Sequence, residues 1–265
     1  MTRGEMMNRL TRAYRRLTWI LCIAGLNPHQ FRSFVRRLPR YAREARAYQR
    51  ARPGEFPIAA GNLVPILVDY DAAAGVASGH YFHQDLWAAR LIHARRPARH
   101  VDIGSRVDGF VAHLLTFMPV TVLDVRPLRS EVEGLSFEQG DITRLDRFAD
   151  GSIASLSSLH AVEHVGLGRY GDDIDPEGWR KAVAELTRVL QPGGRLYFSV
   201  PIGRQRVRFN ADRYFNASTI VRAFAPLRLV SHAAVDDSGR LVRDPPLSAF
   251  DRAEDSCGLF EFTKD

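Results

Sequence analysis

Short apolar segments alternate with amphipathic ones from residue 99 onward, and this alternation leaves few folds open to the chain. The apolar segments have the length of strands, and apolar residues between them recur at helical spacing. Strands that alternate with helices form a doubly wound α/β sheet, which binds ligands at the carboxyl ends of its strands. The predicted strands are 99–104, 120–125, 135–139, 153–159, 195–201, 227–235 and, at an edge, 258–263, and the predicted helices are 107–117, 175–190 and 217–224.

The helix at 175–190 has the clearest boundary signals. Asp175 is a suitable N-cap residue, and Pro176 suits the first helical position, where no backbone N–H is required. The sequence Gln191-Pro-Gly-Gly194 does not continue a helix. We therefore expect the helix to end there and the next strand to follow at once.

The first 53 residues form a strongly basic extension. They carry thirteen arginines against Glu5 and Glu44, a net charge of +11, whereas the whole chain has +7, which leaves −4 for the remainder. The apolar run 17–26 has about ten residues, half of the roughly twenty that a membrane-spanning helix needs. We interpret residues 1–60 as a helical arm, broken at Asn27-Pro28, and residues 61–265 as the α/β domain.

Arginines interleaved with Leu, Trp, Ile, Phe and Tyr are typical of an arm that lies on an anionic membrane surface or binds a partner. The alternative is an arm that packs on its own domain or on a second copy in a homodimer. A nucleic-acid partner is not expected, because the sequence contains no recognisable base-reading module.

Two distant cysteines, Cys22 and Cys257, favour a reducing compartment over a disulfide-stapled secreted fold. No convincing signal-peptide cleavage site follows the apolar run. We therefore expect a cytoplasmic protein, with the arm at the inner face of the membrane if it binds lipid.

Acidic residues follow three successive predicted strands. Asp102-Ile-Gly104 ends the first strand and opens a helix, where glycine permits close backbone approach and free N–H groups are available. Asp124 ends the second strand, in a position to accept hydrogen bonds from ribose hydroxyls. Asp141-Ile142 follows the third strand and could cover an adenine. This set suits an adenosine-bearing ligand.

At these positions the chain resembles the class I S-adenosylmethionine-dependent methyltransferases. The resemblance spans roughly residues 80–265 and is carried by His100-Val-Asp-Ile-Gly-Ser105, Val122-Leu-Asp124, Gly140-Asp-Ile142, Asp150-Gly-Ser-Ile153, Leu159-His-Ala-Val-Glu-His164 and Leu190-Gln-Pro-Gly-Gly-Arg-Leu196. More narrowly, 79–87, 102–110, 166–172 and 209–213 are similar to an uncharacterised branch, a domain of unknown function. Some members of that branch are associated with polysaccharide biosynthesis genes.

The resemblance implies a mostly parallel, seven-stranded Rossmann-like sheet with an antiparallel last strand. It also implies S-adenosylmethionine along the ends of the first three strands, contacted by Asp102, Gly104, Ser105, Arg106, Asp124, Val125, Asp141 and Ile142. The chain departs from the family at Arg106 and Asp108, which replace two glycines of the loop. Arg106 is expected either to crowd the methionine part or to bind its carboxylate.

His160, Glu163 and His164 follow the fourth strand, where an acceptor would meet the methyl group. Methyl transfer to a hydroxyl requires alignment and a base that removes the proton. We expect one imidazole to act as base, His160 before His164, with Glu163 orienting it. The alternative is that these histidines only cap the next helix.

Other functions remain open at this point. His160-Ala-Val-Glu-His164 matches the H-x-x-E-H pattern of inverted zincins, which needs both histidines on one helical face. A nicotinamide-dependent oxidoreductase lacks its G-x-G-x-x-G fingerprint here. A non-catalytic scaffold is compatible with the altered glycine loop. A divalent metal fits Asp172, Asp173 or Asp175 but is not expected, and we assign no metal ligand.

The acceptor is expected to be a small molecule or glycan, with a sugar hydroxyl as the methylated group. Tyr81 and Gln84 lie at the start of the helix before the first strand, which can cover the cofactor in this architecture. Asn210 and Arg213 follow the fifth strand, on the acceptor side. These four residues are the predicted substrate contacts.

Overall fold

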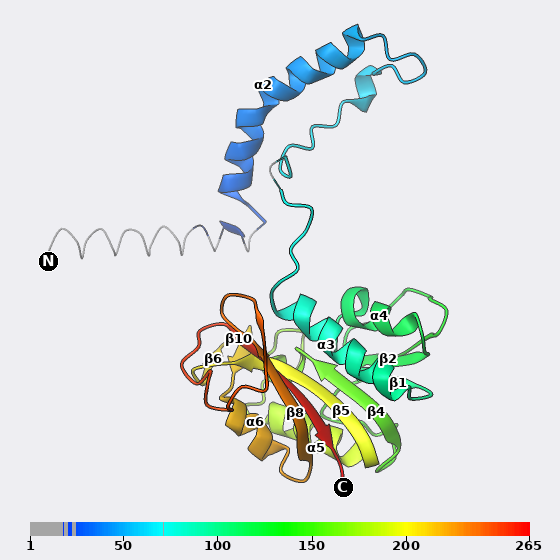
Figure 1. Ribbon diagram of the computed structural model, residues 1–265, viewed down its shortest axis with the longest axis vertical. Helices are drawn as coiled ribbons and strands as arrows, with labels where there is room; N and C mark the ends of the chain where they lie inside the picture. Colours follow the sequence, from blue (N-terminus) through cyan, green and yellow to red (C-terminus); the bar gives the residue numbers. More distant parts are fainter. Residues whose placement is uncertain (1–17, 19–20, 23–24, 71) are drawn as a thin grey trace, which may run out of the picture. The chain divides into compact units, whose positions relative to one another are not determined.

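The computed structural model describes Thr18 and residues 21–22, 25–70 and 72–265 (Figure 1). Contacts divide the chain into two compact units, residues 1–76 and 77–265. Each unit has its own architecture and is described by itself.

The first unit is dominated by α2, which spans Pro28–Arg50. Its N-cap is Asn27, whose side-chain oxygen accepts a hydrogen bond from the backbone N–H of Gln30 at 3.1 Å, and Pro28 occupies the first turn. The predicted break at Asn27-Pro28 is therefore a helix start. The helix continues through Pro39 for 23 residues and buries none of its side chains.

The segment that follows α2 folds back on it through η1, Ala60–Asn62. The Arg37 guanidinium donates to the carbonyl oxygen of Leu67 at 2.7 Å, and that of Arg40 lies 4.2 Å from the centre of the Tyr70 ring. Residues beyond 60 thus belong with the arm. The division falls after Val76, whereas the predicted boundary is after residue 60.

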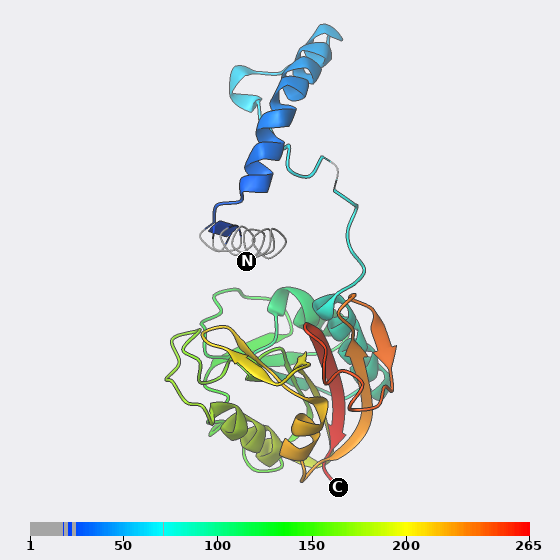
Figure 2. The ribbon, with the colours of Figure 1, turned by 90° about the vertical axis from the view of Figure 1, so that its left-hand side faces the viewer.

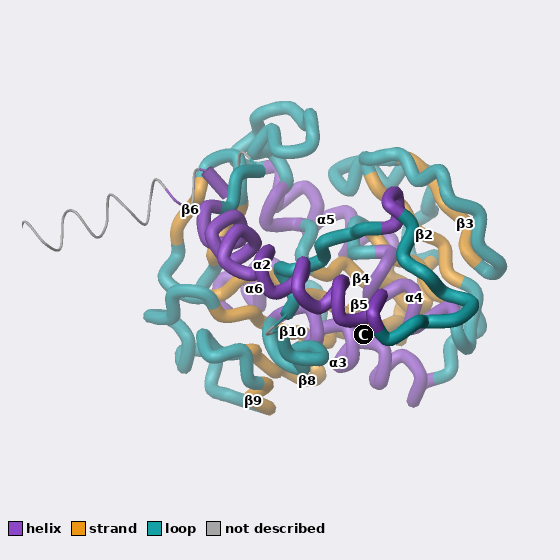
Figure 3. Tube along the Cα trace, turned by 90° about the horizontal axis from the view of Figure 1, so that it is seen from above, coloured by secondary structure: helices purple, strands orange, loops and turns teal. Residues whose placement is uncertain are grey.

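The second unit contains an eight-stranded sheet in the order β3-β2-β1-β4-β5-β10-β8-β9. Figure 3 shows β3 and β9 at opposite ends of this sheet. The strands are β1 His100–Ile103, β2 Val120–Asp124, β3 Leu135–Gln139, β4 Ile153–Leu159, β5 Leu190–Ile202, β8 Arg228–Val235, β9 Leu241–Arg243 and β10 Ser256–Thr263. The first five strands pair in parallel, and β10 is antiparallel to both of its neighbours.

Two sheet predictions were wrong. The sheet has eight strands instead of seven, because hydrogen bonds from the N–H groups of Ser238 and Arg240 to the Asp236 carboxylate turn the chain back, and β9 pairs with β8. The segment 258–263 is not an edge strand. It lies in β10, between β5 and β8, and all of β10 is buried.

Helices cover both faces of the sheet. On one face, α3 (His80–Arg95), the π-helical turn η2 (Val107–Val111) and α4 (Ala112–Leu115) bury Trp87, Phe110 and Leu114 in one core cluster. On the other face, α5 (Gly178–Val189) and α6 (Ala217–Ala223) bury Trp179 and Ile220 in a second cluster. This is the doubly wound arrangement that the alternating pattern predicts. A separate two-stranded ribbon, β6 (Arg206–Arg208) and β7 (Asp212–Tyr214), is drawn in yellow in Figure 2.

Two predicted helices have different boundaries. The helix expected at 107–117 is a π-helical turn followed by the short α4. The helix α5 begins at Gly178, because a turn closed by the hydrogen bond from the N–H of Gly178 to the carbonyl of Asp175 precedes it. Asp175 therefore caps this turn, with its carboxylate accepting from the N–H of Glu177 at 3.0 Å, and Glu177 is the N-cap residue.

Candidate functional site

The loop after β1 is held by its own first residue. The Asp102 carboxylate accepts hydrogen bonds from the hydroxyl of Ser105 at 2.6 Å and from its backbone N–H at 3.1 Å. Gly104 has a φ of +76°, and a Cβ there would lie 2.8 Å from the Cβ of Ala161. Glycine is thus required for the close approach of this loop to the one after β4.

A row of buried polar side chains continues beneath this loop. The His100 imidazole lies 2.7 Å from the hydroxyl oxygen of Ser155 and 2.8 Å from that of Ser157, and Ser157 donates to Asp102. Burial lowers the pKa of His100 to about 3. Burial also raises the pKa of Asp102 to about 6, against the hydrogen bonds from Ser105 and Ser157 that lower it. Asp102 and Ser105 therefore brace the loop, and their side chains are buried.

The sequence alone does not identify His100 and its two serine partners, Ser155 and Ser157, as part of the site. Ser155 and Ser157 are two residues apart on β4, so their side chains face the same side of the sheet, and this spacing was visible in the sequence. It became meaningful only with the register, which pairs Asp102 with Ser157.

Glycines at positions 106 and 108 would leave open space beside the loop after β1. The side chain of Arg106 does not occupy that space. Its side chain is 54% exposed and forms an ion pair of 2.8 Å with Asp108. Its guanidinium carbon lies 5.0 Å from the centre of the Tyr81 ring. Arg106 is thus at the surface of the loop, next to the start of α3.

At the end of β2, Asp124 is engaged by Arg126. The two side chains form paired hydrogen bonds of 3.0 and 2.7 Å, and the backbone N–H of Arg126 adds a third at 2.8 Å. The guanidinium of Arg126 also lies 4.6 Å from the centre of the Tyr170 ring. Val125, between them, has an exposed side chain.

The end of β3 adjoins the end of β2, because the N–H of Gly140 donates to the carbonyl of Asp124 at 3.0 Å. Asp141 is exposed and accepts a hydrogen bond from the backbone N–H of Thr143 at 2.8 Å, and Ile142 is half-buried. The three predicted acidic positions therefore follow three adjacent strands, as the sequence indicates.

Glu163 lies between two histidines in the loop after β4. Its carboxylate is 2.6 Å from Nδ1 of His160 and 3.7 Å from Nε2 of His164, and its side chain is only 1% exposed. The segment Val162–His164 is a single 3-10 turn, so the two imidazoles do not share the helical face that the zincin pattern needs. His160 has a φ of +52°, a strained conformation for a residue other than glycine.

The two histidines differ in their surroundings. Burial lowers the pKa of His160, but the negative charges that Cys257 and Glu163 can carry outweigh it and raise that pKa well above its ordinary range. His164 is held through Nδ1, which lies 2.6 Å from the carbonyl oxygen of Ala211, and its ring contacts Tyr170 edge-on. In His164 the nitrogen nearest the carboxylate is therefore Nε2.

The start of α3 reaches the same loop. The rings of His80 and Tyr81 lie with their centres 5.5 and 5.3 Å from that of His160. Gln84 is buried and accepts a hydrogen bond from the Ser199 hydroxyl at 2.5 Å. Tyr81 is thus the exposed member of the predicted pair, and Gln84 ties α3 to β5.

The two predicted residues after β5 have different positions. The Arg213 guanidinium is buried and donates to the carbonyl oxygen of Val165 at 2.5 Å, so it holds the loop after β4 and does not face an open site. Asn210 is exposed, with a φ of +59°, between β6 and β7. Of these two residues, only Asn210 remains accessible to a substrate.

Two series of side-chain contacts connect these elements. Asp124, Arg126, Tyr170 and His164 form one, from the end of β2 to the loop after β4. The other runs from the loop after β1 to the same place, through Arg106, Tyr81, His160 and Glu163. One region of the second unit is thus surrounded by the carboxyl ends of β1, β2 and β4 and by the start of α3.

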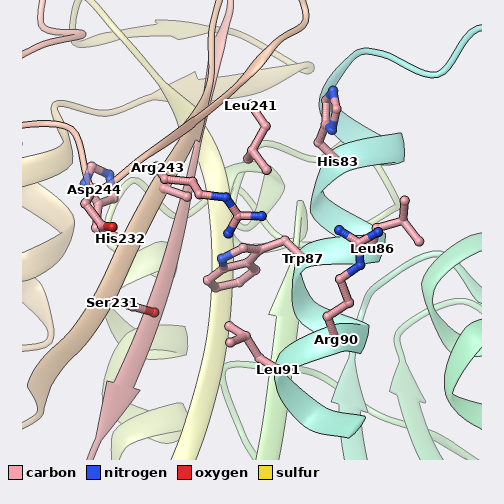
Figure 4. Close-up of a pocket in the computed structure, with 11 residues that line it drawn as sticks. His83, Leu86, Trp87, Arg90, Leu91, Ser231, His232, Leu241, Arg243 and Asp244 are labelled. Atoms are coloured by element: carbon pink, nitrogen blue, oxygen red, sulfur yellow. The ribbon is translucent and has the colours of Figure 1, made fainter. Parts of the chain in front are cut away.

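A pocket of about 210 Å³ lies elsewhere, between α3 and the β8–β9 edge (Figure 4). Figure 4 shows Trp87 and Leu91 of α3 and Arg243 of β9 around it. None of the predicted site residues lines this pocket, and we do not assign it to the site.

The buried His100 should make the stability of the second unit depend on pH. Its pKa is about 3 in the folded chain against 6.5 when unfolded, so below pH 6.5 the unfolded state binds more protons. We expect the free energy of unfolding to fall by about 1 kcal/mol per pH unit between pH 6 and 4, relative to His100→Gln. Urea titrations of both proteins measure this difference. Equal pH dependence, or a His100 ring that NMR finds protonated at pH 5, would contradict the assignment.

Comparison with known proteins supports the fold. The family model of a Caenorhabditis protein of unknown function, DUF268, matches residues 139–234, about a third of the chain. The match includes His160, Glu163 and His164 but not the loop after β1. A search of curated protein sequences gave no significant match.

Similar solved structures cover about 70% of the chain. The N-methyltransferase NodS from Bradyrhizobium japonicum, in complex with S-adenosylhomocysteine, is 16% identical, with a TM-score of 0.50, over 70% of this chain and 88% of that one. The [4+2]-cyclase SpnF is 14% identical, with a TM-score of 0.51, over 68% of this chain and 81% of that one. Together with the strand order and the antiparallel β10, these likenesses show that the second unit has the fold of the class I S-adenosylmethionine-dependent methyltransferases.

Proposed function

We propose that this chain is an S-adenosylmethionine-dependent methyltransferase that methylates a hydroxyl of a sugar or glycan, in polysaccharide biosynthesis. One observation carries the proposal. The side-chain contacts from Asp124 to His164, and from Arg106 to Glu163, join the strand ends that would hold the cofactor to a buried carboxylate flanked by two imidazoles.

The residues after β1, β2 and β3 fit the cofactor. The tight turn at Gly104 leaves room for the loop backbone to approach a ligand closely at the end of β1, and the Asp124 carboxylate is the natural acceptor for the ribose hydroxyls. Arg126 pairs with that carboxylate and would have to share it or move aside. The exposed Arg106 suits the methionine carboxylate, and Val125, Asp141 and Ile142 suit the adenine. When bound, the cofactor supplies an electrophilic methyl group on a sulfonium.

We assign the role of base to His164. The carbonyl of Ala211 accepts a hydrogen bond from Nδ1–H, which leaves Nε2 to take the proton as the acceptor oxygen forms its bond to the methyl carbon and the sulfur–carbon bond breaks. Glu163, 3.7 Å from Nε2, would stabilise the imidazolium that results. His160 is less suitable, because Glu163 engages its Nδ1 and the ring is enclosed by His80 and Tyr81.

The surroundings of His164 suit a polyhydroxyl acceptor. Tyr170 contacts the imidazole and is 37% exposed, so its ring offers an apolar face and a hydroxyl to a sugar. Asp173 and Asn210 are exposed polar residues in the loops that carry Tyr170 and Ala211. The second candidate function is a scaffold that binds the cofactor without turnover, which the altered loop at Arg106 keeps open.

We expect Asp124→Ala to weaken the binding of S-adenosylhomocysteine at least tenfold. Each charge-assisted hydrogen bond to a ribose hydroxyl contributes about 1.5–3 kcal/mol, and a tenfold loss needs about 1.4 kcal/mol. Calorimetric titration measures the dissociation constant, with the exposed Asp146→Ala as matched control. An unchanged constant in Asp124→Ala would refute the ribose assignment.

Substitution His164→Ala should reduce turnover by about 10²–10⁴ and leave the affinity for S-adenosylhomocysteine within about twofold. The assay incubates the protein with S-adenosylmethionine and a panel of nucleotide sugars and glycans, and mass spectrometry detects the added methyl group. The exposed His93→Ala is the matched control. Full turnover in His164→Ala removes this residue as base, whereas tight cofactor binding without methylation of any acceptor favours the scaffold.

We further propose that α2 contacts an anionic membrane surface, at its cytoplasmic face. Its exposed apolar residues Phe31, Val35 and Leu38 recur at helical spacing, and arginines flank them along the helix. Among the described residues, none of the helices has the length and apolar character that a membrane crossing requires.

The full chain should bind anionic vesicles in a salt-sensitive way, because 0.1 M salt screens exposed charges beyond about 10 Å. A chain that starts at Ala77 should lose this binding, and Phe31→Ser with Val35→Ser should weaken it without a change in charge. Vesicle sedimentation measures the bound fraction. Equal binding by the full chain and the chain from Ala77 would exclude the arm as the contact.

A further inference from the structure

Three metal-binding side chains from distant parts of the sequence converge beside the loop after β4. They are His80 at the start of α3, His160 after β4, and Cys257 in β10. One ligand atom from each lies within 4.8 Å of the other two. Among the described residues this is the one such group of three or more histidine, cysteine or carboxylate ligands.

Hydrogen bonds determine which imidazole nitrogens are available. Nδ1 of His160 lies 2.6 Å from the Glu163 carboxylate, so Nε2 is its free nitrogen. This Nε2 is buried, and no described residue forms a hydrogen bond with it. The side chain of His160 is 8% exposed, so water does not readily supply the missing partner. In the neutral ring, with Nδ1–H donated to Glu163, this buried nitrogen carries a lone pair that has no partner and can bind a ligand.

His80 is arranged in the same way. Its Nε2 lies 2.8 Å from the carbonyl oxygen of Asp255, which leaves Nδ1 for a ligand. Asp255 is itself fixed, since Tyr214 donates to its carboxylate at 2.6 Å and Asp237 accepts from its N–H at 3.1 Å. Imidazoles that bind metals usually donate their other N–H to a carboxylate or a backbone carbonyl. The Glu163 carboxylate is such a partner for His160, and the backbone carbonyl of Asp255 is such a partner for His80.

The position of Cys257 is fixed by the sheet. It is fully buried in β10, opposite Pro201 of β5 and Val235 of β8. Its thiol lies 3.7 Å from the carbonyl oxygen of Gly258, a weak contact, and also interacts with the imidazole of His160. The strands on both sides therefore hold a sulfur ligand next to the two imidazoles.

We propose that His80, His160 and Cys257 bind one zinc ion. Two nitrogens and one thiolate form a donor set that zinc prefers, and a tetrahedral ion with bonds of about 2.0–2.3 Å places its ligand atoms about 3.3–3.6 Å apart. Because the three ligand atoms lie within 4.8 Å of one another, the group contracts by at most about 1.5 Å to reach this geometry. The fourth position has no histidine, cysteine or carboxylate within the group, so water or a substrate oxygen fills it, as in catalytic zinc sites.

Zinc at this place ties the start of α3 to the sheet and fixes Tyr81 beside Arg106. Binding releases the protons of the Cys257 thiol and of any imidazolium, because zinc binds thiolate and neutral imidazole. In the proposed methyltransferase, the open position would take the acceptor oxygen, with His164 left as base. That last role rests on the proposed function, whereas zinc binding itself does not.

Metal content of the full-length protein tests the site. The wild type is purified without chelators from cells grown with added zinc. Inductively coupled plasma mass spectrometry should then find one zinc per chain. After removal of zinc, cobalt should produce the strong visible absorption of a tetrahedral ion and a thiolate-to-cobalt charge-transfer band. Cys257→Ser should abolish the charge-transfer band, and His80→Gln should weaken zinc binding at least tenfold in competition with a chromogenic chelator.

Matched controls separate this site from adventitious binding. Cys22→Ser removes the other, exposed cysteine, and His83→Gln removes a histidine one turn along α3; both should bind zinc like the wild type. Wild type without stoichiometric zinc, or Cys257→Ser and His80→Gln with unchanged affinity, would overturn the proposal. Circular dichroism checks folding, and His80→Gln, at a partly exposed position, decides the matter if Cys257→Ser does not fold. Titration with S-adenosylhomocysteine tests the proposed function separately.

Discussion

The buried carboxylate of Asp102 fixes the loop on which the candidate site depends. It accepts hydrogen bonds from both the backbone and the side chain of Ser105 above it, and from Ser157 of β4 beside it. His100 continues the row to Ser155. Because every member has a partner, this row of polar groups can be buried at the β1–β4 junction without a large desolvation penalty. It sets the turn at Gly104 against Ala161, and so sets the distance between the cofactor side and the acceptor side.

Local pattern predicted much of the fold. The strands at 135–139 and 153–159 begin and end at the predicted residues, because turn residues bound both apolar runs. Strand β9 was missed, since three residues at an edge carry almost no periodic signal. The interior place of β10 depends on pairing with β5 and β8, which are distant in sequence, and an apolar run does not reveal its neighbours.

The candidate site, like the fold, could be predicted from the sequence only in part. That polar residues would follow β1, β2, β3 and β4 was readable from spacing, and the structure brings those strand ends together. The contacts of each side chain could not be predicted from the sequence. Arg213 donates to the loop after β4, Arg126 engages Asp124, and Cys257 comes next to His160 only because β10 lies inside the sheet. The solved structures with this fold include an N-methyltransferase and a [4+2]-cyclase, so the chemistry has to be argued from the site and not from the fold.

The interior position of β10 has a consequence for how the molecule is made. Strands β5 and β8 both need this strand as a neighbour, and it is synthesised after them. Until residues 256–263 have left the ribosome, two strand edges stay unpaired and open to association with other chains. The nascent domain is therefore exposed to aggregation from the completion of β5 until β10 is made, and a chaperone that covers sheet edges would protect it. The same late insertion delivers the sulfur of Cys257, so the sheet and the cluster around His160 are completed in a single step.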